Sequence, residues 1–263
     1  MTTDDGLLDL AGRVAVVTGG GTGIGAATVR LLARRGAAVL LAGRTEDRLT
    51  RVAHAVAAET GARCLPVVTD VREEDDCVAL VQRAVGEFGR LDILVNNAGG
   101  ARLTPLESTS TRLWDNTFAL NTRGPFLLTR EAGTVMIGQR SGAIVNISSA
   151  GGVSGVLGGS AYGAAKAALQ MLTTITAAEW GRFGIRANCV AVGLVASENA
   201  LDAWRAADIP SSELSATTPL RRVGQPDEIA EVVGYLVADA SSFVTGQVLS
   251  ADGGPQLTGI PLD

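Results

Sequence analysis

The sequence predicts an α/β fold in which a doubly wound parallel sheet of about seven strands carries helices on both faces. Short, β-rich apolar runs alternate with helical patterns along all 263 residues. The runs VAVVT and ILVNN begin with consecutive apolar residues, as expected of strands that are buried on both sides. Since no linker-like segment interrupts the alternation, residues 1–263 are expected to form a single domain.

The local pattern of each segment predicts the elements in chain order. The first strand is expected at 13–19, and the helix over 24–36 that follows it ends at a glycine. The helix over 45–61 begins at Thr45, a residue type that caps helices, and the helix over 73–89 has acids in its first turn. Further strands are expected at 37–43, 63–70, 91–99, 142–149, 185–192 and 244–254. Further helices are expected at 109–137, 160–182 and 226–239, and 193–219 is expected to be irregular.

Composition and charge argue against several classes of partner. Hydrophobic residues make up 46% of the chain, which is typical of a soluble globular protein. A net charge of −5 argues against a nucleic-acid surface, because phosphate binding needs clustered Lys and Arg. No run approaches the ~18 apolar residues of a membrane span, and the N-terminus lacks the pattern of a signal peptide. We therefore expect a cytoplasmic protein with no membrane or nucleic-acid partner.

Neither the cysteines nor the histidine predict a metal site. Cys64, Cys77 and Cys189 are scattered without a CxxC pair, and we expect them to be buried small hydrophobic residues in a reducing compartment. The only histidine, His54, lies in a segment that reads as an exposed helix. We expect no metal ion and no Ser/His nucleophile.

A glycine-rich turn, TGGGTGIG, joins the first strand to the first helix at residues 18–25. The glycines let the backbone approach a ligand, and the helix N-terminus offers free N–H groups to a pyrophosphate. The pattern therefore indicates a Rossmann-type dinucleotide site, although the spacing departs from G-x-G-x-x-G and a tight turn without a ligand is the alternative.

The end of the second strand predicts which dinucleotide is bound. Gly43 leaves no carboxylate there for a ribose 2′-hydroxyl, whereas Arg44 offers a bidentate fork to a 2′-phosphate. NADP(H) is therefore favoured over NAD(H). The alternative is that Arg44 lies in solvent or pairs with Glu46 or Asp47.

The segment SAYGAAK contains Lys166, while every other basic residue among the 22 lysines and arginines is an arginine. Tyr162, one of only two tyrosines, precedes it by four residues, so both side chains share one face of a helix. A tyrosine that exchanges protons at neutral pH needs its pKa lowered by about 3 units from ~10, and a nearby ammonium supplies part of that shift. The pair on one face predicts proton-transfer chemistry.

With these motifs the chain resembles the short-chain dehydrogenases/reductases in their compact single-domain form, over roughly 10–254. The resemblance rests on ordered motifs: TGGGTGIG (18–25), DV (70–71), NNAG (96–99), the Asn121 of FALN, IVNISS (144–149), YGAAK (162–166), and GQPDEIAEVVGYL and TGQVLSADGG near the C-terminus.

The resemblance implies roles for the catalytic residues. Tyr162 would be the general acid in reduction and the base in oxidation, and Ser149, with Ser148 as a local rival, would hydrogen-bond the carbonyl oxygen. Lys166 would bind the nicotinamide ribose and lower the pKa of Tyr162. Asn121 would sit at a helix irregularity and hold a water in a proton relay.

It also implies cofactor contacts, with two departures from the family pattern. The contacts would come from Gly19, Thr22, Gly23, Ile24, Gly25, Arg44, Asp70, Val71, Asn97, Ala98, Gly99, Tyr162, Lys166, Gly193, Val195 and Ser197. Val192 replaces the usual proline after the sixth strand, and Ser197 replaces a threonine. Thr22 stands where NADP-preferring members often carry a basic residue.

These observations predict an oxidoreductase that interconverts a ketone and a secondary alcohol, most simply an NADPH-dependent reductase of a small molecule such as a 3-ketoacyl thioester. The alternatives are an enoyl-thioester (C=C) reductase and a dinucleotide-binding regulator without turnover. Segment 194–219 is expected to be the substrate lid. The resemblance further implies a homotetramer, or a dimer, built on the long helices, with the tail PQLTGIPLD packing against a neighbour or lying loose.

Overall fold

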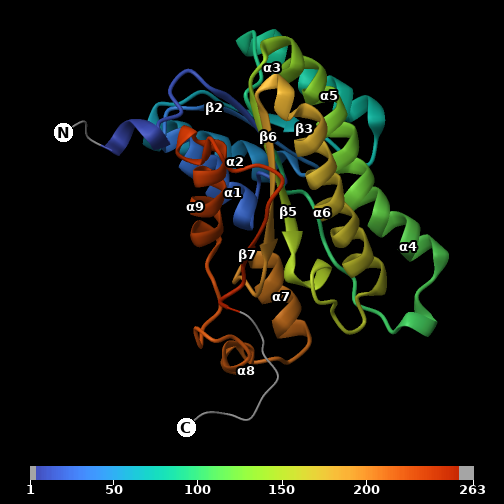
Figure 1. Cartoon of the computed structure of the whole chain (residues 1–263). Coiled ribbons are helices and arrows are strands. Elements are labelled where there is room, and N and C mark those ends of the chain that lie inside the picture. Colours follow the sequence, from blue (N-terminus) through green and yellow to red (C-terminus); the bar gives the residue numbers. More distant parts are fainter. Residues whose placement is uncertain (1–3, 255–263) are drawn as a thin grey trace.

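A seven-stranded parallel sheet organises the computed structural model, which describes residues 4–254 (Figure 1). The strand order is β3-β2-β1-β4-β5-β6-β7, and every pair is parallel. The strands are β1 (Val14–Thr18), β2 (Ala38–Gly43), β3 (Cys64–Val68), β4 (Ile93–Asn96), β5 (Gly142–Ser149), β6 (Ile185–Val192) and β7 (Val248–Ala251). The predicted fold class is confirmed.

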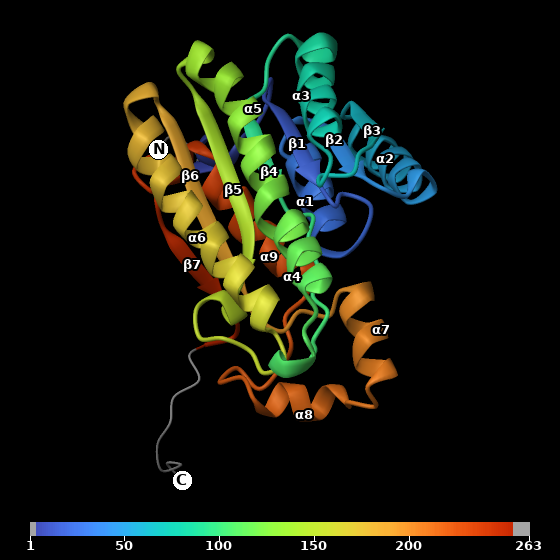
Figure 2. The same ribbon diagram turned by 90° about the vertical axis from the view of Figure 1, so that its right-hand side faces the viewer.

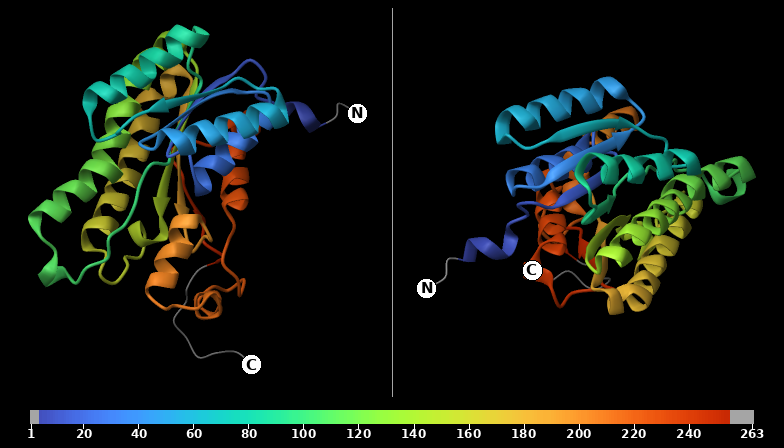
Figure 3. Two further views of the ribbon diagram at one scale, coloured as in Figure 1. Left: turned by 180° about the vertical axis from the view of Figure 1, so that it is seen from behind. Right: turned by 90° about the horizontal axis from the view of Figure 1, so that it is seen from above.

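Two helical layers cover the sheet (Figures 2 and 3). One apolar cluster packs α1 (Gly23–Arg34), α2 (Glu46–Thr60) and α9 (Pro226–Val237) on one face. A second packs α3 (Glu74–Phe88), α5 (Gly124–Gln139) and α6 (Ser160–Trp180) on the other. All residues of β1 and β4 are buried, which explains why their sequences lack the alternation of a half-exposed strand.

The helix ends follow the expected chemistry, with one exception. Gly61 and Gly89 end α2 and α3 in the left-handed conformation, with φ of 71° and 76°. Pro226 is the first residue of α9, where Gln225 and Glu228 also form a capping box. Thr45 occupies the N-cap position of α2 but makes no side-chain capping bond, so that part of the prediction was wrong.

Two segments next to the carboxyl edge of the sheet differ from the elements that the local pattern predicts, although the break at Ala119–Arg123 is the irregularity that the family resemblance implied at Asn121. The helix expected over 109–137 is broken into α4 (Thr111–Phe118), a π-turn (Ala119–Arg123) and α5. The segment expected to be irregular contains α7 (Glu198–Ala206) and α8 (Ser211–Ala216), because Ser197 caps α7 by accepting from the Ala200 amide. Short helical turns lie at Asp4–Leu8, Leu106–Ser108, Ala150–Gly152, Gly181–Phe183 and Asp239–Ser241.

The direction of chain progression reverses between β1 and β4, so the loops that leave these two strands diverge at the carboxyl edge. A ligand site is expected at such a switch point. In Figures 1 and 2, α7 and α8 lie below this edge. Within residues 4–254 no helix has the length and apolarity to cross a membrane. The tail PQLTGIPLD, residues 255–263, lies outside the described residues.

The start of α5 is packed against the loop after β3, which gives a test of the fold. A Cβ at Gly124 would lie 2.7 Å from the Val71 carbonyl oxygen, so Gly124→Ala is expected to lower the free energy of unfolding by about 1–3 kcal/mol. Gly138→Ala, in the last turn of the same helix, meets nothing within 4 Å and is expected to stabilise by up to about 1 kcal/mol. Urea unfolding measures both, and equal stabilities would contradict the packing described for Gly124.

Candidate active site

The glycine-rich turn forms a cradle at the N-terminus of α1. Gly23 opens the helix with a φ of +51°, a conformation that other residues rarely adopt. A Cβ at Gly25 would lie 2.1 Å from the Gly19 carbonyl oxygen, so only glycine fits. Thr22 is the N-cap residue and makes no side-chain capping bond, which leaves the first-turn amides of α1 free of such a partner. This geometry fits a phosphate.

The loop after β4 is fastened to this turn by hydrogen bonds. The Asn97 and Ala98 amides donate to the Thr18 hydroxyl at 3.0 and 2.9 Å, and Asn97 Nδ2 donates to the Thr18 carbonyl at 2.8 Å. Two loops that are far apart in sequence are therefore tied together as one wall of the site.

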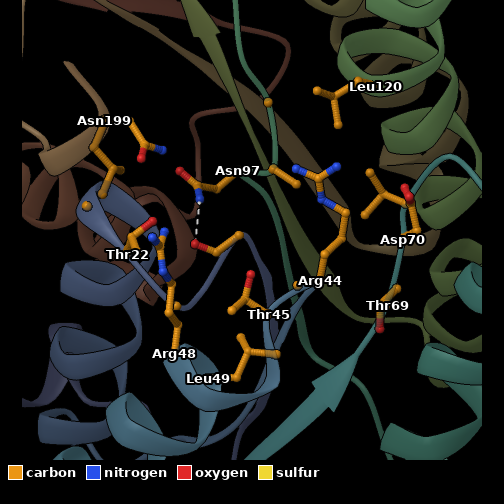
Figure 4. A pocket seen from close by; sticks show the side chains of 18 of the residues that line it. Thr22, Arg44, Thr45, Arg48, Leu49, Thr69, Asp70, Asn97, Leu120 and Asn199 are labelled. Atoms are coloured by element: carbon orange, nitrogen blue, oxygen red, sulfur yellow. Dashed lines mark hydrogen bonds between the residues drawn. The ribbon is translucent and has the colours of Figure 1, made fainter. Parts of the chain in front are cut away.

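A cavity of about 280 Å³ lies between the turn, the end of β2 and the loop after β4 (Figure 4). Eleven of the residues expected from the sequence line it: Gly19, Thr22, Gly23, Ile24, Arg44, Asp70, Val71, Asn97, Ala98, Gly99 and Ser197. The sequence reasoning missed its other lining residues: Gly21, Gly43, Thr45, Arg48, Leu49, Thr69, Leu120 and Asn199. The five other expected cofactor contacts, Gly25, Tyr162, Lys166, Gly193 and Val195, do not line it.

Two exposed arginines, Arg44 and Arg48, give this cavity its positive charge. Neither forms an ion pair with an acid of the described chain, which disfavours pairing of Arg44 with Glu46 or Asp47. A Cβ at Gly21 would lie 3.3 Å from Arg48 Cβ, so α2 carries Arg48 against the glycine-rich turn.

Asp70, the acid that lines the cavity, has its negative charge already paired with the Arg72 guanidinium. It is bound by the guanidinium and amide of Arg72, which hold the pKa of its carboxyl below the usual range, with a smaller contribution from Arg44. Arg44 and Arg48 are therefore the charges left for an anionic ligand.

The two candidate serines at the end of β5 face different surroundings. The buried Ser148 hydroxyl donates to the Lys166 carbonyl at 3.0 Å and accepts from Gln170, so it is used in packing β5 on α6. The half-buried Ser149 hydroxyl accepts from the Gly151 amide at 3.1 Å and hydrogen-bonds Tyr162. Of the two, Ser148 has its proton committed to a backbone carbonyl of α6, whereas the Ser149 hydroxyl lies at Tyr162.

Tyr162 and Lys166 lie on one face of α6, with Lys166 Nζ 5.8 Å from the centroid of the tyrosine ring. Lys166 is 4% exposed and donates to the Ile147 carbonyl at 2.8 Å. Burial lowers the pKa of Lys166 to about 8. Burial also raises the pKa of Tyr162, while the hydrogen bond with Ser149 lowers it. The expected lowering of the Tyr162 pKa by Lys166 is therefore not seen, because desolvation dominates.

Asn121 lies fully buried in the π-turn, which confirms the expected helix irregularity. Its amide donates to the Thr117 and Gly100 carbonyls at 3.0 Å each, and its carbonyl accepts from the Gly100 amide at 3.2 Å. Asn121 thereby joins the helix to the loop after β4, beside Lys166.

The segment after β6 reaches the cavity through Ser197, whose Cβ would lie 3.0 Å from a Cβ at Gly23. Gly193 instead packs on Asp252, where a Cβ would lie 2.5 Å from the Asp252 Cα. Val195 is buried and pairs with Gly224.

The histidine and two of the three cysteines lie as expected, whereas the expectation that Cys64 is buried was wrong, because β3 is an edge strand. His54 is exposed on α2, Cys77 and Cys189 are buried, and Cys64 is half-buried. In the part of the chain that the structure describes, no cluster of His, Cys, Asp and Glu has the makings of a metal site. The arrangement thus combines a phosphate cradle and a positively charged cavity with a Ser-Tyr-Lys group on neighbouring strand and helix ends. Such a set fits a nicotinamide dinucleotide and one proton transfer.

Comparison with known proteins points the same way. Residues 19–256 match a family model described as enoyl-(acyl carrier protein) reductase. The chain is 43% identical to cis-4-hydroxycyclohexanecarboxylate dehydrogenase of Sinomonas cyclohexanicum, covering 93% of this chain and 96% of that one. It is 36% identical to peroxisomal 2,4-dienoyl-CoA reductase of Danio rerio over 95% of this chain and 83% of the relative. A solved structure from Beutenbergia cavernae with NADP bound at low occupancy has a TM-score of 0.88 and 38% identity, covering 95% and 98% of the two chains.

The crowding around Gly99 gives a test of this geometry. A Cβ there would lie 2.9 Å from Asn121 Oδ1 and 3.1 Å from Lys166 Nζ, so Gly99→Ala is expected to displace both side chains and to destabilise the fold by about 1–3 kcal/mol. Gly100→Ala is the matched control, since its Cβ would meet only Leu120 at 4.0 Å. Thermal unfolding compares the two. If both variants melt together with the wild type, the site is not packed as described.

Proposed function

Because the chain belongs to the short-chain dehydrogenase/reductase family of oxidoreductases, we propose that it reduces a ketone to a secondary alcohol with NADPH, or runs the reverse reaction. The observation that carries this proposal is the meeting of Ser149, Tyr162 and Lys166 at the end of β5 and the start of α6. The relative with 43% identity is named for the oxidation of a ring alcohol, which supports carbonyl chemistry.

In this mechanism the bound nicotinamide supplies the hydride that reaches the carbonyl carbon, and the protein handles one proton. The Ser149 hydroxyl donates its one proton in a hydrogen bond to the carbonyl oxygen, while the Gly151 amide donates to one of its two lone pairs and fixes its position. Tyr162 transfers its proton to the same oxygen as charge develops there. Tyr162 is the neutral phenol at neutral pH, which is the form that donates, but burial raises its pKa and makes it a weaker acid, so the lowering of this pKa is assigned to the bound cofactor.

Lys166 and Asn121 assist this proton transfer without contacting the carbonyl oxygen. Lys166 stays largely cationic at neutral pH with a pKa of about 8, and its ammonium would hold the nicotinamide ribose. Asn121 fixes the loop after β4 beside it. A water held at Asn121, as the family resemblance implies, would return the proton to Tyr162 through Lys166.

The choice of NADPH rests on the two unpaired arginines of the cavity. Arg44 follows β2, where the adenosine ribose of a dinucleotide lies in this fold, and Arg48 stands against the glycine-rich turn. Together they offer two guanidinium forks to a 2′-phosphate, and Arg48 supplies from α2 the positive charge that Thr22 does not provide.

The proposed substrate presents an apolar body next to its carbonyl group. A Cβ at Gly151 would lie 3.4 Å from Ser149 Oγ and 3.1 Å from Val156, and one at Gly159 would lie close to both Val156 and Leu103. Val156 thus stands near Ser149 and Leu103 stands next to Val156, with Leu103 57% and Val156 43% exposed. An apolar wall beside the reacting oxygen favours an alicyclic or aliphatic ketone over a sugar phosphate.

Reduction of a C=C bond is the second candidate, favoured by the family model's description and by the dienoyl-CoA reductase relative. A substrate panel of ring ketones, 3-ketoacyl thioesters and 2-enoyl thioesters with NADPH separates the two. We expect turnover of ketones. Turnover of enoyl thioesters alone would assign the chemistry to C=C reduction. The lid role of 194–219, the cytoplasmic location and the homotetramer or dimer remain predictions.

Tyr162→Phe is expected to lower kcat for ketone reduction by about 10²–10⁴-fold, because the proton donor is lost while the fold and the cavity are kept. NADPH binding, measured by fluorescence titration, is expected to stay unchanged. Tyr235→Phe removes the chain's other tyrosine hydroxyl, which is 40% exposed on α9, and is expected to be fully active. A Tyr162→Phe enzyme with wild-type turnover would show that another group donates the proton.

Arg44→Ala and Arg48→Ala are each expected to weaken NADPH binding by about 10-fold or more and to change NADH binding by less than about 2-fold. Arg51→Ala, an exposed arginine of α2 that does not line the cavity, is the control and is expected to bind both nucleotides normally. Equal losses for NADPH and NADH in the first two variants would mean that the arginines contact the shared phosphates instead.

A further inference from the structure

Gln170, on α6, is hydrogen-bonded to Ser148 and Ser149 at the end of β5, yet the mechanism above does not use it. It lies one helical turn after Lys166 and two turns after Tyr162 on the same face of α6. Its Nε2 donates to Ser148 Oγ at 3.0 Å and to the Ser149 carbonyl at 3.3 Å. The side chain therefore spans from the catalytic helix to the residue that would bind the carbonyl oxygen.

The chemistry of the partners fixes the direction of both hydrogen bonds. The Ser149 carbonyl is an acceptor only, and the Ser148 hydroxyl already gives its proton to the Lys166 carbonyl at 3.0 Å. Both contacts therefore require the N–H₂ end of an amide. A side chain of the same shape without N–H groups would face a carbonyl oxygen and an oxygen lone pair, and neither contact would remain.

The turn that follows Ser149 is pressed against the same side chain. A Cβ at Gly152 would lie 2.8 Å from Gln170 Nε2 and 2.9 Å from the Ala167 amide. Gly151, the donor to Ser149 Oγ, belongs to this turn. The orientation of the Ser149 hydroxyl thus depends on a backbone that Gln170 holds against α6.

Resting on the function proposed above, we propose that Gln170 is a positioning residue, which sets the Ser149 hydroxyl relative to Tyr162 by tying the carboxyl end of β5 to α6. Gln170 does not touch the reacting atoms. It acts through the Ser149 backbone and through the Ser148 hydroxyl. Its loss is expected to affect the step in which charge develops on the carbonyl oxygen, more than the binding of either ligand.

The test uses two near-isosteric variants of the full chain, Gln170→Met, which is neutral, and Gln170→Glu, which keeps the shape but has no N–H group. Both are expected to lower kcat for ketone reduction about 10-fold, to leave the ketone KM within about 2-fold and to leave the Kd for NADPH unchanged. A loss in Gln170→Glu alone would assign the effect to its charge near Lys166 and would overturn the proposal.

Gln139→Met is the matched control for a purely structural effect. Gln139, on α5, also bridges a helix to the sheet region, through the segment before β4: it accepts from the Leu91 amide at 3.0 Å and donates to the Leu91 carbonyl at 2.8 Å. Leu91 lies at the amino ends of the strands, away from the carboxyl ends that carry the proposed active centre. Gln139→Met is therefore expected to melt at a lower temperature with kcat unchanged. Wild-type kcat in Gln170→Met, or an equal loss of kcat in Gln139→Met, would overturn the positioning role.

The Gln170 proposal and the proposed function can fail independently of each other. Ketone turnover by the wild type and its loss in Tyr162→Phe test the function, whereas the contrast between Gln170→Met and Gln139→Met tests the positioning role. An enzyme that reduces ketones through Tyr162 and tolerates Gln170→Met keeps the first proposal and loses the second.

Discussion

The hydrogen bonds that join β5 to α6 determine the geometry of the proposed active centre. Four residues in a row on the strand, Asn146 to Ser149, each bond a side chain of the helix, through Thr173, Lys166 and Gln170. A helix that packed on apolar contacts alone would tolerate small sliding movements, whereas these directional bonds specify one register. Ser149 and Tyr162 are 13 positions apart in the chain and meet because that register is held. The proposed chemistry depends on these hydrogen bonds between β5 and α6 more than on any single residue of the cavity.

The packing of α6 on β5 also explains which parts of the site can be predicted from the sequence. Strand alternation places Asn146 and Ser148 on one face of β5 and Ile147 on the other, but the sequence does not say which face receives α6. Strand alternation alone therefore does not separate Ser148 from Ser149; the family resemblance favoured Ser149, and the packing shows that the Ser148 hydroxyl is bonded to α6. Arg48 was missed for a similar reason. Its approach to the glycine-rich turn follows from how α2 packs on β2, a tertiary contact with no local signature.

The fold was more predictable than the site because its signals are local. Continuous apolar runs gave the buried strands, and the glycines after α2 and α3 gave the helix ends. Segment 193–219, expected to be irregular, contains α7 because a local start signal is present there. Ser197 followed by Glu198 is a helix start, and Ser197 caps α7. Reading this serine only as a replacement for a cofactor-binding threonine hid its capping role. It serves as the cap of α7 and as part of the cavity wall.

The lone lysine of the chain can be understood from burial. Position 166 is 4% exposed, has one carbonyl acceptor at 2.8 Å and faces Gly99 at close range. An arginine there would bring five donors and a charge that it cannot lose into a space with room for one small cation. Lysine adapts, because burial lowers its pKa to about 8 while leaving it largely charged at neutral pH. The same burial raises the pKa of Tyr162, and the lysine does not overcome it. In the protein without cofactor the pair is therefore a neutral phenol beside a buried, largely charged ammonium, and the lowering of the Tyr162 pKa that proton exchange requires has to come from the bound, positively charged oxidised nicotinamide.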